Sequence, residues 1–196
     1  SPMPHNQLTL SDVRQTLLDL SEECFQRREE LQGNIADFCF RGLASRPFFE
    51  QLVDYTAGRK PMKSGILLAL SLLMAKRFRN EIDGERVGVV LPPGIGVTVV
   101  NLGLLFAGKI PVNLNFTAGR AAIESSYRKG EIDTVITVEA LKKKIPQFPW
   151  PDHTIDIVPL LQGADKKAII LRYLLIIIFP ARLLARMMGI PKYGDD

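Results

Sequence analysis

The sequence predicts an α/β protein with a mostly parallel sheet and flanking helices, preceded by a helical segment. Short apolar runs alternate with helix-length segments between residues 86 and 158, which is the pattern of right-handed crossovers between parallel strands. A length of 196 residues suits one large domain, or one domain with an appendage. With 46% apolar and 23% charged residues, the composition excludes a disordered chain and a disulfide-rich mini-protein.

Two helices are expected before the sheet. Ser11 is a suitable N-cap, and apolar residues follow it at helical spacing, which predicts an amphipathic helix over residues 11–31. A second helix is predicted over residues 34–45. These helices do not resemble the start of a sheet, so residues 1–47 are interpreted as a helical linker or connector.

The sheet-forming part is expected from residue 48 onward, with a turn at Gly58-Arg59 after its first strand. The predicted strands cover residues 51–55, 86–91, 110–114, 134–137 and 154–158. The predicted helices cover residues 64–79, 95–107, 119–129 and 138–144. Helices of this length between the later strands bring each strand back in the same direction, so the sheet is predicted to be mostly parallel.

Residues 165–190 are predicted to form an apolar helix with a sparse basic component. From residue 168 to residue 190 the only charged side chains are Arg172, Arg182 and Arg186, and on one continuous helix they share an arc of about 80°. Such a helix can lie in a membrane interface, with its arginines at the lipid phosphates. Alternatively, it packs on the sheet or against another part of a longer protein. The longest uncharged run is shorter than the roughly 18–20 residues that a membrane span needs.

The sequence contains no recognisable catalytic, cofactor-binding or metal-binding pattern. Neither His5 nor His153 belongs to an HxxxxD motif, and HExxH, GxSxG and GxxxxGK[ST] are all missing. Cys24 and Cys39 fit neither a zinc spacing nor a CxxC pair, which favours reduced thiols in a cytoplasmic protein. The basic clusters at residues 76–79 and 142–144 fall at predicted helix ends, where cations are favourable, so no nucleic-acid partner is expected.

A turn at Gly94–Gly96 leaves a small nucleotide-binding protein as a further alternative. The turn follows a predicted strand and opens a predicted helix, as a phosphate-binding turn does. However, Val99 stands where a GxGxxG motif has its third glycine, and Asn113 and Asn115 stand where an acidic residue would hold a ribose. These departures favour a plain strand-to-helix turn.

Residues 85–117, ERVGVVLPPGIGVTVVNLGLLFAGKIPVNLNFT, resemble the opening of adenylate-forming acyl-activating enzymes. In that family a strand ending in Leu-Pro precedes a helix, and a segment like residues 104–115, LLFAGKIPVNLN, leads into the next strand. The closing residues 114–117 are most similar to the acyl-ACP synthetase part of bifunctional acyl-ACP synthetase/2-acylglycerophosphoethanolamine acyltransferases. The resemblance extends over about residues 48–196, and the motifs that carry it belong to the scaffold.

The resemblance implies that residues 48–196 are a partial N-terminal subdomain of an AMP-binding domain. Such enzymes attack the α-phosphate of ATP with a fatty carboxylate and pass the acyl group to the thiol of an acyl carrier protein or coenzyme A. In the bifunctional members the acyl group ends on a lysophospholipid, and residues 1–47 would connect to an upstream acyltransferase domain. ATP and Mg are therefore implied for a longer parent enzyme.

The sequence also departs from the family. Residues 62–66 lack the Tyr and Glu of the family's TYxEL motif, and the phosphate loop that ends in PKG is missing from residues 1–196. We therefore expect this piece by itself to be inactive, with no catalytic, cofactor-binding or metal-binding residues. It is expected in the cytoplasm, and the membrane-interface interpretation of residues 165–190 would place it at the inner membrane. The alternative is a non-catalytic α/β module that binds a membrane or a partner through residues 165–190.

Overall fold

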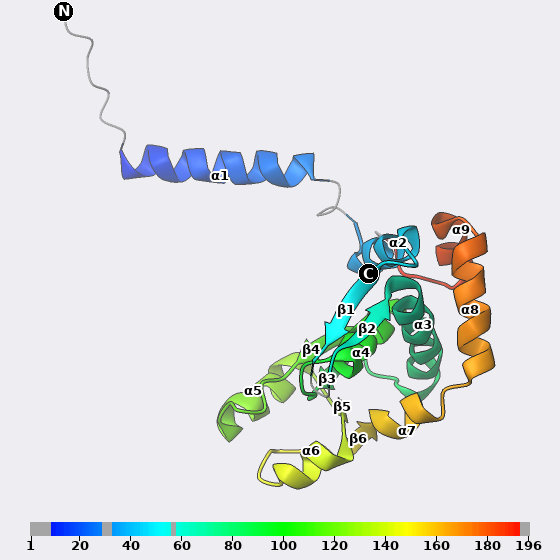
Figure 1. Ribbon diagram of the computed structural model, residues 1–196. Coiled ribbons are helices and arrows are strands. Elements are labelled where there is room, and N and C mark those ends of the chain that lie inside the picture. The colour runs from blue at the N-terminus through cyan, green and yellow to red at the C-terminus, as the bar shows by residue number, and fades with distance from the viewer. Residues whose placement is uncertain (1–8, 29–32, 56–57, 193–196) are drawn as a thin grey trace, which may run out of the picture.

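A four-stranded parallel sheet organises the computed structural model, which describes residues 9–28, 33–55 and 58–192 (Figure 1). Its strands, in the spatial order β4-β3-β5-β6, are β4 (Ile110–Asn113), β3 (Arg86–Val89), β5 (Thr134–Thr137) and β6 (His153–Asp156). All three neighbouring pairs are parallel, so the predicted fold class is confirmed. The central strands β3 and β5 are buried almost throughout, which explains why they appear as continuous apolar runs in the sequence.

Helices return the chain between these strands. They are α4 (Ile95–Phe106) before β4, α5 (Arg120–Gly130) before β5 and α6 (Glu139–Lys144) before β6. Each lies within one or two residues of its predicted range. Gly108, at φ +75°, ends the turn that follows α4, and its left-handed conformation lets β4 begin two residues later.

The helix α3 (Ser64–Glu81) lies at the centre of the larger hydrophobic core. It packs against α4 on one side and α8 (Lys166–Ile178) on another, and α2 (Ile35–Ser45) crosses its N-terminal half (Figure 1). The largest side chains of this core are fully buried: Phe40, Phe78 and Phe106. A second, smaller core lies under α5, around Leu114, Ile123 and Phe148.

An antiparallel hairpin of β1 (Glu50–Asp54) and β2 (Lys60–Lys63) precedes α3. The sequence predicts β1 but not β2. The reason is that residues 60–63, Lys-Pro-Met-Lys, have almost no apolar alternation, and their proline suits an edge strand only. The turn predicted at Gly58-Arg59 is confirmed, since Gly58 adopts φ +91° just before β2 begins at Lys60.

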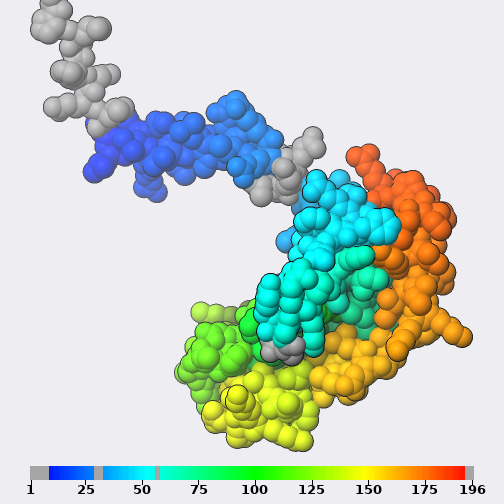
Figure 2. All heavy atoms as spheres, viewed as in Figure 1, coloured from blue at the N-terminus to red at the C-terminus, as the bar shows by residue number. Residues whose placement is uncertain are grey.

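The two N-terminal helices differ in their surroundings. Helix α1 (Leu10–Arg27) projects away from the rest of the molecule (Figures 1 and 2), and none of its residues is buried. Helix α2 instead places Ala36, Phe40 and Leu43 in the main core. Within the segment interpreted as a connector, residues 35–45 therefore contribute to the packing of the sheet-forming part.

The C-terminal segment departs most from its prediction. The expected strand over 154–158 ends at Asp156, because the carboxylate of Asp156 caps a short helix, α7 (Ile157–Gln162). The expected single helix over 165–190 is two helices, α8 and α9 (Ala181–Met187). Phe179 adopts an extended conformation before Pro180, as residues that precede proline prefer, and α9 turns back to pack against α2.

Close packing around the central strand gives a test of this fold. A Cβ atom added at Gly88 in β3 would lie 2.7 Å from Val135 Cγ2, so Gly88→Ala must displace the side chain of Val135 in the neighbouring strand. We expect a loss of about 1–3 kcal/mol in the free energy of unfolding, measured by urea denaturation. The control is Gly96→Ala, because a Cβ atom at Gly96 would have no neighbour within 4 Å. Equal losses in both variants would contradict the packing described for β3.

Candidate functional site

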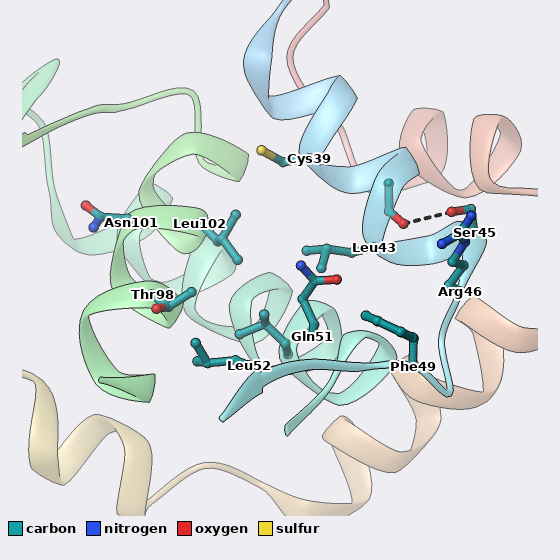
Figure 3. A pocket seen from close by; sticks show the side chains of 12 residues that line it. Cys39, Leu43, Ser45, Arg46, Phe49, Gln51, Leu52, Thr98, Asn101 and Leu102 are labelled. Carbon is teal, nitrogen blue, oxygen red and sulfur yellow. Dashed lines mark hydrogen bonds between the residues drawn. The ribbon is translucent and has the colours of Figure 1, made fainter. Parts of the chain in front are cut away.

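A cavity of about 730 Å³ lies between α2, β1, α3 and α4 (Figure 3). Much of its lining consists of apolar side chains, and the polar ones come from α2, β1, α4 and the turn after α2. The lining residues are Cys39, Gly42, Leu43, Ser45, Arg46, Phe49, Gln51, Leu52, Leu67, Thr98, Asn101 and Leu102. Its volume lies within the range of about 300–1,000 Å³ that is usual for small-molecule sites.

Backbone hydrogen bonds hold the walls of this cavity in place. The N–H of Ser64 donates to the carbonyl of Phe49, and that of Gly65 donates to Pro47, each at 2.9 Å. These bonds join the start of α3 to the segment that links α2 to β1. Two segments that are separate in the chain, the start of α3 and the link between α2 and β1, are therefore joined directly beside the cavity.

The polar side chains on the α4 wall already have internal partners. The hydroxyl of Thr98 donates to the carbonyl of Gly94 at 3.0 Å. The amides of Asn101 and Asn113 exchange two hydrogen bonds of 3.2 Å across the end of β4. Because these groups are satisfied, the α4 side of the cavity presents mainly Leu102 to a ligand.

Arg46 and Cys39 are the lining residues that have ionisable side chains. Arg46 is exposed, and no ion-pair partner for it occurs among the described residues. Burial raises the pKa of the Cys39 thiol above its ordinary value, so this thiol is protonated at neutral pH and is a poor nucleophile. The cavity is thus equipped to bind an apolar group beside a cation, and its cysteine is not activated for covalent chemistry.

The turn before α4 does not offer a phosphate site. The N–H of Ile95, at the start of α4, donates to Asp54 Oδ2 at 3.1 Å. A Cβ atom at Gly94, which has φ +145°, would lie 2.8 Å from the same carboxylate oxygen. A carboxylate therefore occupies the end of the helix where a phosphate would bind, and its charge would repel a nucleotide.

The structure separates the three arginines that were singled out in the sequence. Arg172 is half-buried on α8, where its guanidinium donates to the carbonyl of Ala168 at 3.0 Å. Arg182 and Arg186 are exposed on α9 and line a hollow of about 600 Å³ together with Arg41 of α2. The common arc expected on one helix is wrong in this respect, because the chain breaks at Pro180 between α8 and α9.

Two further charged residues line the hollow between α2 and α9. Lys192 lines it, and so does Asp37, whose carboxylate pairs with Arg41 at 2.9 Å. Arg79 fixes the segment that follows α9. Its guanidinium donates to the carbonyl of Gly189 in that segment and to the carbonyl of Phe106 at the end of α4. Positive charge therefore gathers between α2 and α9 and not along one face of α8.

Among residues 9–28, 33–55 and 58–192, no cluster of three or more His, Cys, Asp or Glu side chains could hold a metal ion. In the same ranges, no helix combines the length and the apolar character needed to cross a bilayer.

No protein-family model matches the chain. Solved structures do match it at the level of fold. The fatty acid AMP ligase from Legionella pneumophila has 18% sequence identity and a TM-score of 0.56, and the match covers 72% of this chain and 26% of that one. The Klebsiella oxytoca NpsA N-terminal subdomain, solved with 3-hydroxybenzoyl-AMSN, has 15% identity and a TM-score of 0.58, covering 70% and 33% of the two chains. A benzoate CoA ligase from Burkholderia xenovorans LB400 has 23% identity, a TM-score of 0.52, and coverages of 69% and 28%.

The fold of this chain is similar to part of these structures, one of which is the N-terminal subdomain of NpsA. The chain spans about a quarter to a third of the length of these three structures. At such low identities the likeness shows the fold alone. The expected architecture is thereby confirmed, and what the chain binds or helps to catalyse is a separate question.

The cavity is the feature that the sequence did not reveal. Leu43, Leu52 and Leu102 each belong to an ordinary apolar pattern of their own helix or strand. Nothing in the sequence around each of these leucines indicates that their neighbours leave a cavity between them. The only hint is Gly42, a residue that lowers helix stability inside a helix and is tolerated here where its missing side chain faces the cavity.

Proposed function

We propose that this chain is part of the N-terminal subdomain of a fatty-acid-activating ligase and that its cavity holds the acyl chain. Two observations support the proposal. The fold is similar to that of enzymes that include a fatty acid AMP ligase, and residues 85–117 resemble the opening of the acyl-activating family. The apolar cavity with Arg46 at its edge is the observation that points to a fatty carboxylate.

The chemistry of the cavity suits such a ligand. Each CH₂ group moved from water into an apolar site contributes about 0.8 kcal/mol, so an acyl chain gains affinity with length. Arg46 is exposed beside Phe49 and can attract a carboxylate without the cost of burying a charge. A fatty carboxylate therefore matches both parts of the lining better than a nucleotide does.

The remaining steps belong to a longer parent enzyme in this proposal. The described residues have no donor set suited to Mg, and Asp54 occupies the start of α4. ATP and Mg would then bind to segments outside this chain, and no step is assigned to them here. The parent would activate the fatty acid and pass it to an acyl carrier protein or coenzyme A. The bifunctional variant would pass it on to a lysophospholipid in the cytoplasm, with residues 1–47 as the connector.

A second candidate function, membrane docking, rests on the outer face of α8. Ile169, Tyr173 and Ile176 pack towards the core, while five large apolar residues on the opposite face are exposed. The exposed residues, at helical spacing, are Ile170, Leu171, Leu174, Ile177 and Ile178. An apolar helix face with cations near its ends is typical of helices that lie in a membrane interface.

The cations for this second candidate come from two places. Lys166 and Lys167 begin α8, and Arg182 and Arg186 lie on the exposed side of α9. Arg172 is half-buried, and it precedes the exposed Leu174 by two residues, which sets the two side chains on nearly opposite sides of α8. The lipid-facing role proposed for three arginines therefore falls to Arg182 and Arg186.

The assignment to a longer ligase predicts where activity resides. Residues 1–196 alone should give no fatty-acid-dependent exchange of pyrophosphate into ATP, because they lack the phosphate loop. The product of the longer reading frame that contains them should give such exchange. Exchange by residues 1–196, or a longer product that activates no carboxylate, would contradict the assignment.

The cavity predicts a selective loss of fatty-acid binding. Gly42→Leu should fill the space, since a Cβ atom at Gly42 meets nothing within 4 Å and the residue lines the cavity. We expect a dissociation constant for a fluorescent fatty acid raised by at least about tenfold, with unfolding stability kept. Gly96→Leu makes the same change on another helix in similarly open space and should bind as the parent sequence does. Unchanged binding by Gly42→Leu would place the acyl chain elsewhere.

The membrane candidate predicts a position-dependent effect of charge reversal. Sedimentation with vesicles that contain phosphatidylglycerol should fall by at least about tenfold in affinity for Arg182→Glu/Arg186→Glu. Arg172→Glu is the matched control, because it changes a charge of the same kind on the packed side of α8, and it should leave vesicle binding close to its original level. Equal binding by all three proteins would reject membrane docking through this segment.

A further inference from the structure

The hollow between α2 and α9 gathers four cationic side chains around one carboxylate, which gives its lining a net charge of +3. The charged groups come from α2, from α9 and from the segment that follows α9. The lining residues are Asp37, Arg41, Arg182, Leu183, Arg186 and Lys192. A concave surface lined by one sign of charge focuses the electric field, so it attracts anions more strongly than scattered surface cations do.

The two arginines of α9 are not explained by the stability of that helix. Arg182 lies in the first turn of α9, where the helix dipole disfavours a cation. Arg186 follows it by four residues, so two like charges are neighbours on the helix surface, which is a destabilising arrangement. Neither arginine has an ion-pair partner within residues 9–28, 33–55 and 58–192. Departures from local preference without local compensation are typical of functional sites, and an anion in the hollow would offset both effects.

Packing fixes the α9 side of the hollow. Leu184 and Ala185 are buried in the core, and α9 lies against α2 (Figure 1). The guanidinium of Arg79 donates to the carbonyl of Gly189 at 2.9 Å and so anchors the segment that leads to Lys192. The backbones that carry these cations are therefore held in place before a ligand binds.

Arg41 is positioned on the α2 side with part of its guanidinium left for a ligand. Its Nε donates to Asp37 Oδ2 at 2.9 Å, and its Cζ lies 4.8 Å from the centre of the Phe38 ring. The ion pair uses only Nε, so the terminal N–H groups of Arg41 remain as donors.

We propose that this hollow binds the phosphate group of a phosphorylated small molecule or of a lipid. Three of its four cations are arginines, whose planar forks match phosphate oxygens in pairs. A phosphomonoester carries a charge of about −1.5 to −2 at pH 7, which the net positive charge of the lining offsets. The volume of about 600 Å³ lies within the range of about 300–1,000 Å³ usual for small-molecule sites, so there is room for the group that bears the phosphate.

The lining does not favour a nucleotide as the phosphorylated ligand. No aromatic side chain occurs among the described residues that line the hollow, and its apolar component is Leu183. A nucleobase would therefore find no ring on which to stack.

Phosphate binding does not depend on the function proposed for the cavity. The hollow and the cavity share no lining residue, so fatty-acid binding and phosphate binding can fail separately. The exposed apolar face of α8 is also outside the hollow, so a soluble phosphate tests this site without any contribution from membrane docking.

The first test is calorimetric titration of residues 1–196 with inorganic phosphate at low ionic strength, where charges are least screened. We expect saturable binding, with a dissociation constant raised by at least about tenfold in Arg182→Gln/Arg186→Gln. The control is Arg128→Gln/Lys129→Gln, which also removes two exposed cations, from the last turn of α5 far from α9 (Figure 1). This control should bind as the parent sequence does. No binding by the parent sequence, or equal losses in the two variants, would overturn the proposal.

The second test identifies the source of the phosphate group. Binding of glycerol 3-phosphate is compared with binding of phosphatidylcholine vesicles that contain phosphatidic acid, at equal concentrations of accessible phosphate. Tighter binding to the vesicles assigns the site to a lipid headgroup, and equal or tighter binding of glycerol 3-phosphate assigns it to a soluble ligand. The protein with Arg182→Gln/Arg186→Gln should lose the tighter of the two interactions. If this variant binds both probes as the parent sequence does, the proposal is wrong.

Discussion

The burial of α3 on nearly every side is the constraint on which the rest of this structure depends. Half or more of its residues are buried, among them Leu68, Met74 and Phe78. A helix that is apolar all round has to be enclosed by other elements, since no orientation exposes only polar groups. Here α4, α8, α2 and the β1–β2 hairpin enclose it. The close approach of α4 depends on Gly103, where a Cβ atom would lie 3.0 Å from Phe78 Cε2.

The same enclosure creates the cavity and the exposed face of α8. The α2 helix and the hairpin meet α3 and α4 at an angle that leaves space above Leu67, and that space is the cavity. On the other side, α8 covers α3 with one face only and leaves its opposite face without a cover among the described residues. Both candidate binding surfaces are thus consequences of how α3 is covered.

The side chains that line the cavity and the hollow between α2 and α9 are suited to binding. The one half-buried thiol has a raised pKa, and the helix terminus best placed for an anion is taken by Asp54. The cationic hollow between α2 and α9 shares no lining residue with the cavity, so Arg46 supplies the positive charge at the cavity. In the proposed function, the residues that line the cavity hold part of the substrate while other segments of a longer protein carry out the reaction.

The sequence by itself determined the parallel sheet and the helices that cross between its strands. The strands β3 and β5 depend on their continuous apolar runs, which are visible in the sequence. The cap of α1 was predicted wrongly: Thr9, and not Ser11, caps this helix, because its hydroxyl accepts from the N–H of Asp12. Only the tertiary structure decided that α9 folds back onto α2 and carries Arg182 away from Arg172. It also decided that Lys60–Lys63 pairs as β2 and that Leu43, Leu52 and Leu102 surround a cavity. Such features depend on contacts between residues far apart in the chain, and these contacts leave no periodic signal in any one segment.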